Sequence, residues 1–191
     1  MKTYNDQTKI AEHYNLISPY YHSLWGEHLH HGYWVTGKET KEEAQLALTK
    51  HLVDVADIKS GSKILDVGCG FGASSIYLAK NYKAETTGIT GQTNKYITPI
   101  EKGMLVELQT MQDYISILKA NGLTISKIEN LNEHTAKTWD ISLDIIKDKA
   151  FWRLALENGS EFINFLKAFR AMKNGFSSGN FVYGLIVATK I

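Results

Sequence analysis

A short acidic and glycine-rich segment constrains the fold of this chain more than any other feature. In Asp66-Val-Gly-Cys-Gly-Phe-Gly72, three glycines follow the apolar run Lys63–Val67 and precede the helical pattern of Ala73–Asn81. Glycine allows a sharp turn and lets a ligand approach the backbone closely. The start of a helix offers free backbone N–H groups. The order of strand, glycine turn and helix therefore predicts a ligand-binding turn in an α/β fold.

The glycine spacing and the preceding acid distinguish between ligands. Dinucleotide sites usually space their glycines G-x-G-x-x-G and hold a pyrophosphate at the helix start. Here the spacing is G-x-G-x-G, and Asp66 stands two residues before Gly68. A buried carboxylate needs a donor or a cation, which favours the ammonium group of S-adenosylmethionine over a nicotinamide dinucleotide. The alternatives are a plain tight turn with a hydrogen-bonded Asp66 and a nicotinamide-dependent oxidoreductase.

The neighbouring segments predict a βαβ unit with a parallel sheet. Helical spacing of apolar residues covers Lys41–Ala56, while Lys63–Val67 is predicted as a buried strand and Glu85–Thr90 as a second strand. The other expected elements are a helix over Ile100–Asn121, a strand over Leu123–Leu131, a mostly helical stretch over Lys137–Met172 with a break near Asn158 and Gly159, and a final strand over Phe181–Thr189.

Length and charge indicate a soluble, cytoplasmic protein. The 191 residues suit one domain. The net charge of +1 gives no basic surface for nucleic acid or for an anionic membrane. The single cysteine, Cys69, excludes an internal disulfide and favours a reducing cytoplasm. Met1–Ile10 lacks the apolar core of a signal peptide, and no stretch is long enough to span a bilayer.

Several stretches carry a family resemblance. They are Tyr20-Tyr21, Trp25-Gly-Glu-His28, His30-His-Gly-Tyr-Trp34, Ile64–Gly72, Thr87-Gly-Ile-Thr90 and Gly179–Ala188. Together they resemble class I S-adenosylmethionine-dependent methyltransferases, in particular the tocopherol, sarcosine/dimethylglycine and natural-product subgroup. The resemblance implies a Rossmann-like methyltransferase sheet with flanking helices and an N-terminal helical lid. It also implies S-adenosylmethionine as cofactor and methyl transfer to oxygen, nitrogen or carbon of a small-molecule acceptor.

The resemblance and the glycine motif together give a set of candidate site residues. His31 is a candidate general base because imidazole titrates near neutral pH, and the alternative is a packed aromatic loop. Tyr20 and Tyr21 could place a ring or hydroxyl near the sulfonium, where cation–π attraction is favourable, and ordinary core packing is the alternative for one of the two. His28, His30 and His31 lack a carboxylate or cysteine at a zinc-site spacing, so no metal site is expected. The residues expected to bind the cofactor are Tyr21, His31, Gly32, Tyr33, Asp66, Gly68, Cys69, Gly70 and Thr90.

The middle of the chain departs from this family pattern. Members of the family continue after the second strand with a helix, a third strand, an acidic turn that binds adenine and further strands. Here Thr90, at the place of the ribose acid, is followed by Gly91-Gln-Thr-Asn-Lys95 and a helix of C-terminal type. A natural shortened form, an artefact of the gene model and an omitted segment would each give this sequence. The resulting sheet is incomplete. We therefore expect one domain, residues 1–191, made of an N-terminal lid and cap (1–58), a glycine-motif βαβ half (59–91) and a C-terminal segment (92–191).

The incomplete sheet has two consequences. Unpaired strand edges favour association, so we expect a homo-oligomer formed through these edges. The cofactor contacts of the missing block are also lost. The alternative function is therefore a catalytically impaired methyltransferase remnant that acts as a binding or interaction protein.

Overall fold

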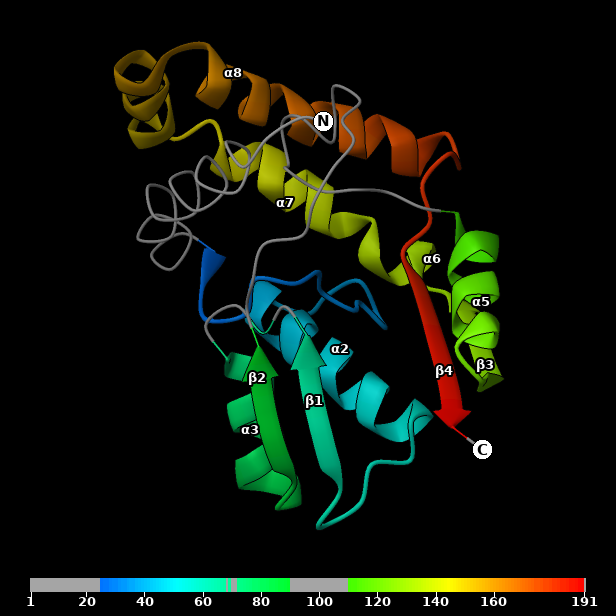
Figure 1. Cartoon of the computed structure of the whole chain (residues 1–191). Coiled ribbons are helices and arrows are strands. Elements are labelled where there is room, and N and C mark those ends of the chain that lie inside the picture. The colour runs from blue at the N-terminus through cyan, green and yellow to red at the C-terminus, as the bar shows by residue number, and fades with distance from the viewer. Residues whose placement is uncertain (1–24, 68, 70–71, 90–109, 191) are drawn as a thin grey trace. The chain divides into compact units, whose positions relative to one another are not determined.

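The computed structural model describes residues 25–67, 69, 72–89 and 110–190 (Figure 1). The chain divides into two compact units, Met1–Asn94 and Lys95–Ile191. The N-terminal unit contains α2 (Lys41–Val55), β1 (Lys63–Val67), α3 (Ala73–Tyr82) and β2 (Glu85–Ile89). The C-terminal unit contains α5 (Met111–Ala120), β3 (Leu123–Asn130), α6 (Asn132–Thr135), α7 (Lys137–Ile145), α8 (Lys149–Ser177) and β4 (Gly184–Lys190). The interpretation of residues 1–191 as one domain stays a prediction.

The N-terminal unit has the predicted βαβ arrangement. β1 and β2 pair in parallel, with Asp66 opposite Gly88, and Figure 1 shows α2 and α3 behind the strand pair. Ile64 of β1 packs against a buried cluster that includes Val53 of α2 and Leu78 of α3. Both helices therefore cover the same face of β1, the face that carries Ile64 and Asp66.

The prediction that Lys63–Val67 is a buried strand is wrong for Leu65. Leu65 is 60% exposed. Successive side chains of a strand point to opposite faces, so Leu65 points away from the face on which Ile64 packs. No described element of the N-terminal unit buries it there.

The C-terminal unit is built on an antiparallel strand pair. β3 and β4 pair with an irregular register between Ile125 and Lys127, and the pair packs against α5. The four strands found among the described residues therefore form two separate pairs, β1 with β2 and β3 with β4. The final strand begins at Gly184, later than predicted, because Asn132 holds the preceding segment: its Nδ2 donates to the carbonyl of Phe181.

The helix expected over Ile100–Asn121 begins later, at Met111. Thr110 has an extended backbone (ψ 156°), and its side chain accepts the N–H of Asp113 while the Asp113 carboxylate accepts the N–H of Thr110. This capping box starts a new helix, so a continuous helix through Thr110 is excluded. Residues 100–109 lie outside the described residues. The helix ends where predicted, at Asn121, and the following Gly122 has a φ of +76°.

Two helices close the C-terminal unit around an aromatic core. Trp139 of α7 is 4% exposed, and its ring lies 6.0 Å from that of Phe169 and 5.9 Å from that of Phe176, both on α8. As predicted, α8 is interrupted near Asn158 and Gly159, because Gly159 has a non-helical backbone (φ 71°, ψ −151°). The helix pair is therefore held mainly by burial of aromatic surface.

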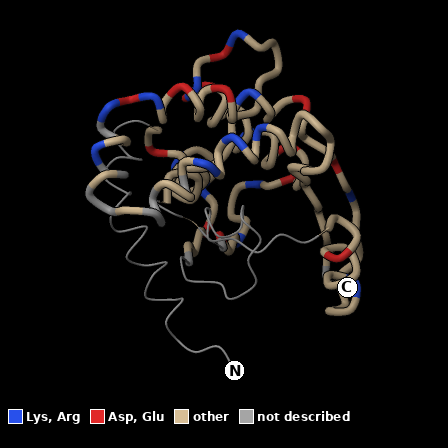
Figure 2. Tube along the Cα trace, turned by 90° about the horizontal axis from the view of Figure 1, so that it is seen from above, with Lys and Arg blue, Asp and Glu red and all other residues tan. Residues whose placement is uncertain are grey.

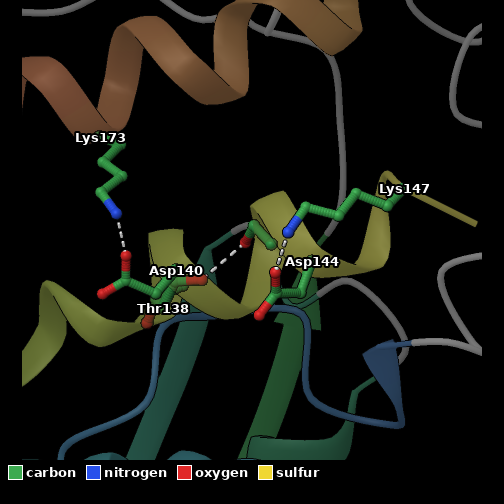
Figure 3. Close-up of polar contacts among 6 residues, drawn as sticks. Thr138, Asp140, Asp144, Lys147 and Lys173 are labelled. Atoms are coloured by element: carbon green, nitrogen blue, oxygen red, sulfur yellow. Dashed lines mark hydrogen bonds and ion pairs between the residues drawn. The ribbon is translucent and has the colours of Figure 1, made fainter.

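Charged contacts on this helix pair are exposed. Lys173 of α8 pairs with Asp140 of α7, and Lys147 Nζ lies 2.6 Å from Asp144 Oδ1 (Figure 3). Such surface pairs contribute about 0–1 kcal/mol each.

Acidic and basic residues are interspersed along the described helices (Figure 2). Within the described ranges, no helix combines the length and the apolar character needed to cross a membrane.

Candidate functional site

The predicted glycine turn joins β1 to α3. Gly72 is the N-cap of α3 with a φ of +78°, a left-handed conformation that glycine adopts without strain, and no side chain caps the helix start. Its N–H donates to the carbonyl of Cys69 at 2.8 Å, and its carbonyl accepts the N–H of Ile76 at 2.8 Å. The other two glycines, Gly68 and Gly70, lie outside the described residues.

Asp66 lies at the end of β1 with one carboxylate oxygen engaged. Ser75 Oγ, on the first turn of α3, donates to Asp66 Oδ2 at 2.6 Å. This contact satisfies part of the half-buried carboxylate from within the chain, as the plain-turn alternative expects. Within the described residues Ser75 is the side chain that donates to Asp66, and a carboxylate accepts through two oxygens, so this contact leaves capacity for an ammonium group. The acceptor capacity of Asp66 therefore fits the ammonium group at the methionyl end of S-adenosylmethionine.

Cys69 packs tightly against β2. A Cβ added to Gly88 would lie 2.9 Å from Cys69 Sγ and 3.1 Å from Cys69 Cβ. Gly88 is therefore needed for the turn to pack against β2. The sequence pointed to this glycine only through the family resemblance of the Thr87-Gly-Ile stretch. Thr90, which follows β2, lies outside the described residues, as does Tyr21.

The aromatic loop His28–Trp34 lies on α2. Tyr33 N–H donates to the carbonyl of Ala44 at 2.8 Å. A Cβ on Gly32 would lie 2.5 Å from the ring of Trp34 and 2.8 Å from Ala44 Cβ. Trp34 and Ala44 are both buried, and the ring of Tyr33 stacks on that of His51 with centroids 4.5 Å apart and planes 13° apart. Gly32 is therefore required by the packing of this loop.

His31 does not titrate near neutral pH. Burial, with a smaller contribution from His30, lowers the pKa of His31 to about 3. The ring is neutral above that pH and accepts a proton only weakly, so the reason for treating His31 as a general base is wrong. Its contact with a cofactor stays a prediction.

A polar network connects this loop to the start of α3. His30 Nδ1 lies 2.8 Å from the carbonyl of His31, and His30 Nε2 lies 3.1 Å from His28 Nδ1 and 3.3 Å from Ser74 Oγ. Thr49 Oγ1 of α2 lies 3.4 Å from both His30 Nε2 and Ser74 Oγ. We call His28, His30, Thr49 and Ser74 the imidazole–hydroxyl network. Through it the His28–Trp34 loop meets the first turn of α3, which also carries Ser75 and its bond to Asp66.

Sequence reasoning missed the supporting side chains on α2. Gln45 is 1% exposed and its Nε2 donates to the carbonyl of His28 at 2.6 Å. Thr49, one helical turn later, is 2% exposed. Two polar residues four apart on the inner face of a helix were an available signal, because side chains at that spacing share one face. Their partners could not be read from the sequence.

The C-terminal unit carries no residue of the predicted site. It has a pocket of about 680 Å³ lined by Thr110, Met111, Tyr114, Ile117, Leu118, Asn180, Phe181, Val182, Gly184 and Ile186. Among the described residues of both units, no group of three or more His, Cys, Asp or Glu side chains is placed to hold a metal ion.

The model of the mycolic acid cyclopropane synthetase family matches residues 1–102, slightly more than half of the chain. Curated relatives are matched over part of their length. The 27-O-demethylrifamycin SV methyltransferase of Amycolatopsis mediterranei (strain S699) is 38% identical over 82 residues, which is 43% of this chain and 30% of the relative. The chloroplastic tocopherol O-methyltransferase of Arabidopsis thaliana is 37% identical over 93 residues, 42% of this chain and 27% of the relative. The chain thus spans less than a third of the length of these two relatives.

Solved structures share the fold at low identity. Mycolic acid cyclopropane synthase CmaA1, complexed with SAH and CTAB, superposes with a TM-score of 0.75 at 16% identity, over 98% of each chain. Geranyl diphosphate C-methyltransferase from Streptomyces coelicolor A3(2), in complex with S-adenosyl-L-homocysteine, gives 0.66 at 12% identity over 100% of each chain. These likenesses show the Rossmann-like fold and confirm the predicted α/β fold class. Within the described ranges the sheet is incomplete, as predicted, because the strands form two separate pairs.

Proposed function

The chain belongs to the mycolic acid cyclopropane synthetase family of class I S-adenosylmethionine-dependent methyltransferases, and from this membership we propose that it transfers a methyl group from S-adenosylmethionine to a small molecule. The observation that carries the proposal is the turn after β1. There Asp66 and an uncapped helix start lie together, and the imidazole–hydroxyl network joins them to the His28–Trp34 loop.

Each proposed contact follows from the chemistry of the side chain. Asp66 binds the ammonium group with the capacity that Ser75 leaves. Gly68 and Gly70 leave room for the cofactor beside the backbone, and Cys69 lines the turn. The further cofactor contacts that we propose are Tyr21, His31, Gly32, Tyr33 and Thr90.

The protein's part in the reaction is alignment and exclusion of water. When bound, S-adenosylmethionine supplies an already activated methyl group. The chain must then hold the acceptor atom in line with that methyl group and keep solvent away. His31, neutral at physiological pH because of its lowered pKa, offers a hydrogen bond rather than a charge. A base is needed only where the acceptor must lose a proton.

We propose an acceptor with a large apolar part. The relatives named above are a demethylrifamycin methyltransferase and a tocopherol O-methyltransferase. A third, 24-methylenesterol C-methyltransferase 3 of Arabidopsis thaliana, is 39% identical over 77 residues, 40% of this chain and 21% of the relative. The acceptor atom is oxygen, nitrogen or carbon.

A reducing cytoplasmic setting and self-association through strand edges stay predictions. Size-exclusion chromatography with light scattering tests the self-association.

Calorimetric titration with S-adenosylhomocysteine tests the cofactor site. We expect Asp66→Asn to weaken binding at least tenfold, because a charge-assisted hydrogen bond to the ammonium contributes about 1.5–3 kcal/mol. Asp54→Asn is the matched control, since Asp54 is an exposed acid on α2. Equal affinities of Asp66→Asn and the wild-type protein would remove Asp66 from the site.

A catalytically impaired remnant is the second candidate function. The observation in its favour is Thr90, which stands where relatives carry the acid that binds ribose. Binding of S-adenosylhomocysteine without turnover on any apolar acceptor would favour the remnant. Turnover on one such acceptor would exclude it.

A further inference from the structure

The two histidines at the start of the loop contact hydroxyls from two helices. His30 Nε2 faces Ser74 Oγ of α3 at 3.3 Å and Thr49 Oγ1 of α2 at 3.4 Å. His28 Nδ1 lies 3.1 Å from His30 Nε2 and 3.5 Å from Ser74 Oγ. Thr49 is buried, and the two rings and Ser74 are half-buried. Four polar atoms from three elements therefore meet within hydrogen-bonding range.

The protonation state of His30 follows from its other nitrogen. The carbonyl of His31 only accepts, so His30 Nδ1, 2.8 Å away, carries the proton. In the neutral ring Nε2 is then an acceptor. It can accept from the hydroxyl of Ser74, the hydroxyl of Thr49 or the Nδ1–H of His28. The neutral network is thus hydrogen-bonded, with His30 Nε2 as its central acceptor.

We propose that the imidazole–hydroxyl network is a positioning device, which fixes the His28–Trp34 loop against the first turn of α3 and so aligns Gly32 and Tyr33 with Asp66 for cofactor binding. The proposal rests on the proposed function. It assigns positioning roles to His30, Thr49 and Ser74, residues that touch the loop and the helix start rather than the reacting atoms.

Double protonation breaks this network. With both rings charged, His28 Nδ1 and His30 Nε2 would be two donors 3.1 Å apart, so the direct hydrogen bond between the two rings is lost and the two charges repel each other. Ser74 lies in the first turn of α3, where the helix dipole also disfavours positive charge. Burial lowers the pKa of both rings. The charge of Glu27 acts in the opposite direction on His28, and the charge of Asp66 does so on His30, whose pKa is lowered further by His28. His31 is the other titratable group in contact. The loop therefore loosens only at a pH low enough to protonate both rings, below the ordinary range of imidazole.

The test measures S-adenosylhomocysteine affinity by calorimetry between pH 8 and pH 5, with circular dichroism to verify that the protein stays folded. We expect wild-type affinity to fall at least tenfold over this range. In His30→Gln, whose amide does not titrate, we expect the fall in affinity between pH 8 and pH 5 to shrink below threefold, whatever its affinity at pH 8. Ser74→Ala should bind at least fivefold more weakly at pH 8, and Ser74→Thr should restore binding.

Hydrogen exchange of the peptide containing Tyr33, corrected for the intrinsic pH dependence of exchange, reports loop position without a cofactor. Its N–H bonds to Ala44, so exchange should accelerate in Ser74→Ala and, at pH 5, in the wild type. Ser116→Ala, which removes an exposed hydroxyl on α5, should change neither readout. Unchanged exchange in Ser74→Ala overturns the proposal, as does a wild-type affinity independent of pH. If the wild type binds no S-adenosylhomocysteine at pH 8, the proposed function fails, and exchange alone decides the role of the network.

Discussion

The two units of the chain satisfy their buried polar side chains in different ways. In the N-terminal unit, Gln45 donates to the carbonyl of His28, 17 residues away on a separate segment. In the C-terminal unit, the hydroxyl of Thr135 donates to the carbonyl of Leu131, four residues earlier. Both side chains are almost completely buried. The first bond fixes the position of a loop, whereas the second only satisfies a hydroxyl within its own turn.

Other pairs repeat this contrast. Ser75 reaches from α3 to Asp66 on β1 in the N-terminal unit, while Ser142 donates back to the carbonyl of Thr138 within α7. Asn132 makes long-range polar contacts in the C-terminal unit, to the backbone of Phe181 and Tyr183, but its side chain is only partly buried. Among the described residues, the buried Gln45 and Ser75 thus bond to other segments in the unit that contains most of the family match, residues 1–102, whereas Thr135 and Ser142 bond within their own helical turns. We infer that these bonds serve the site, and that the C-terminal unit depends on apolar packing.

Two tryptophan substitutions give the largest expected effect. Trp34 is 5% exposed and Trp139 is 4% exposed, so alanine at either position should lower the free energy of unfolding by about 3–5 kcal/mol, measured by urea denaturation. Only Trp34→Ala should also weaken S-adenosylhomocysteine binding, because its ring supports Gly32. A tenfold loss of affinity in folded Trp139→Ala would break the proposed division between the units.

The acid sensitivity of the N-terminal unit is the next largest effect. The pKa of His31 is about 3 in the folded chain and about 6.5 when unfolded. The unfolded ring therefore binds the proton first, and stability falls as pH drops from 6.5 toward 3. Between pH 7 and pH 5 the loss from His31 is about 2 kcal/mol. Denaturant curves at the two pH values measure it, and His31→Asn should reduce the difference by that amount. Equal pH dependence in the variant would contradict the burial of a neutral ring.

The sequence predicted local structure better than contacts between elements. The bounds of α2, α3, β1 and β2 follow from apolar periodicity and from the glycine turn, and they lie within one residue of expectation. The exposure of Leu65 did not follow, since an apolar strand does not reveal which of its faces is covered. Thr110 lay inside the expected helix, but its capping box with Asp113 starts a new helix at Met111.

The candidate site was predicted as separate motifs. The acid-plus-glycine turn was identified from the residues, and the His30–Trp34 loop from the family resemblance, because each is a local pattern. Their connection was not, since it depends on Thr49 and Ser74, which lie 25 residues apart in the sequence. The lowered pKa of His31 also depends on burial by distant residues, so its ordinary titration was expected in error.

The smallest expected effect comes from removing either of two serine hydroxyls. Ser75 bonds to another element, and Ser142 bonds within its own helix. Ser75→Ala removes the donor to Asp66 Oδ2 and should lower the free energy of unfolding by about 1 kcal/mol, the net contribution of an ordinary intramolecular hydrogen bond. Ser142→Ala removes a bond to its own helix and should change stability by less than about 0.5 kcal/mol, because alanine has the higher helix propensity and the Thr138 carbonyl remains in a helical turn. Denaturation in urea measures both. The two variants should differ more clearly in S-adenosylhomocysteine affinity: Ser75→Ala releases the carboxylate that we assign to the ammonium and should bind a few-fold more weakly, whereas Ser142→Ala should bind as the wild type does. Equal affinities would mean that bonds between elements in the N-terminal unit are no more closely tied to the site than the local bonds of the C-terminal unit, and the contrast would then describe packing alone.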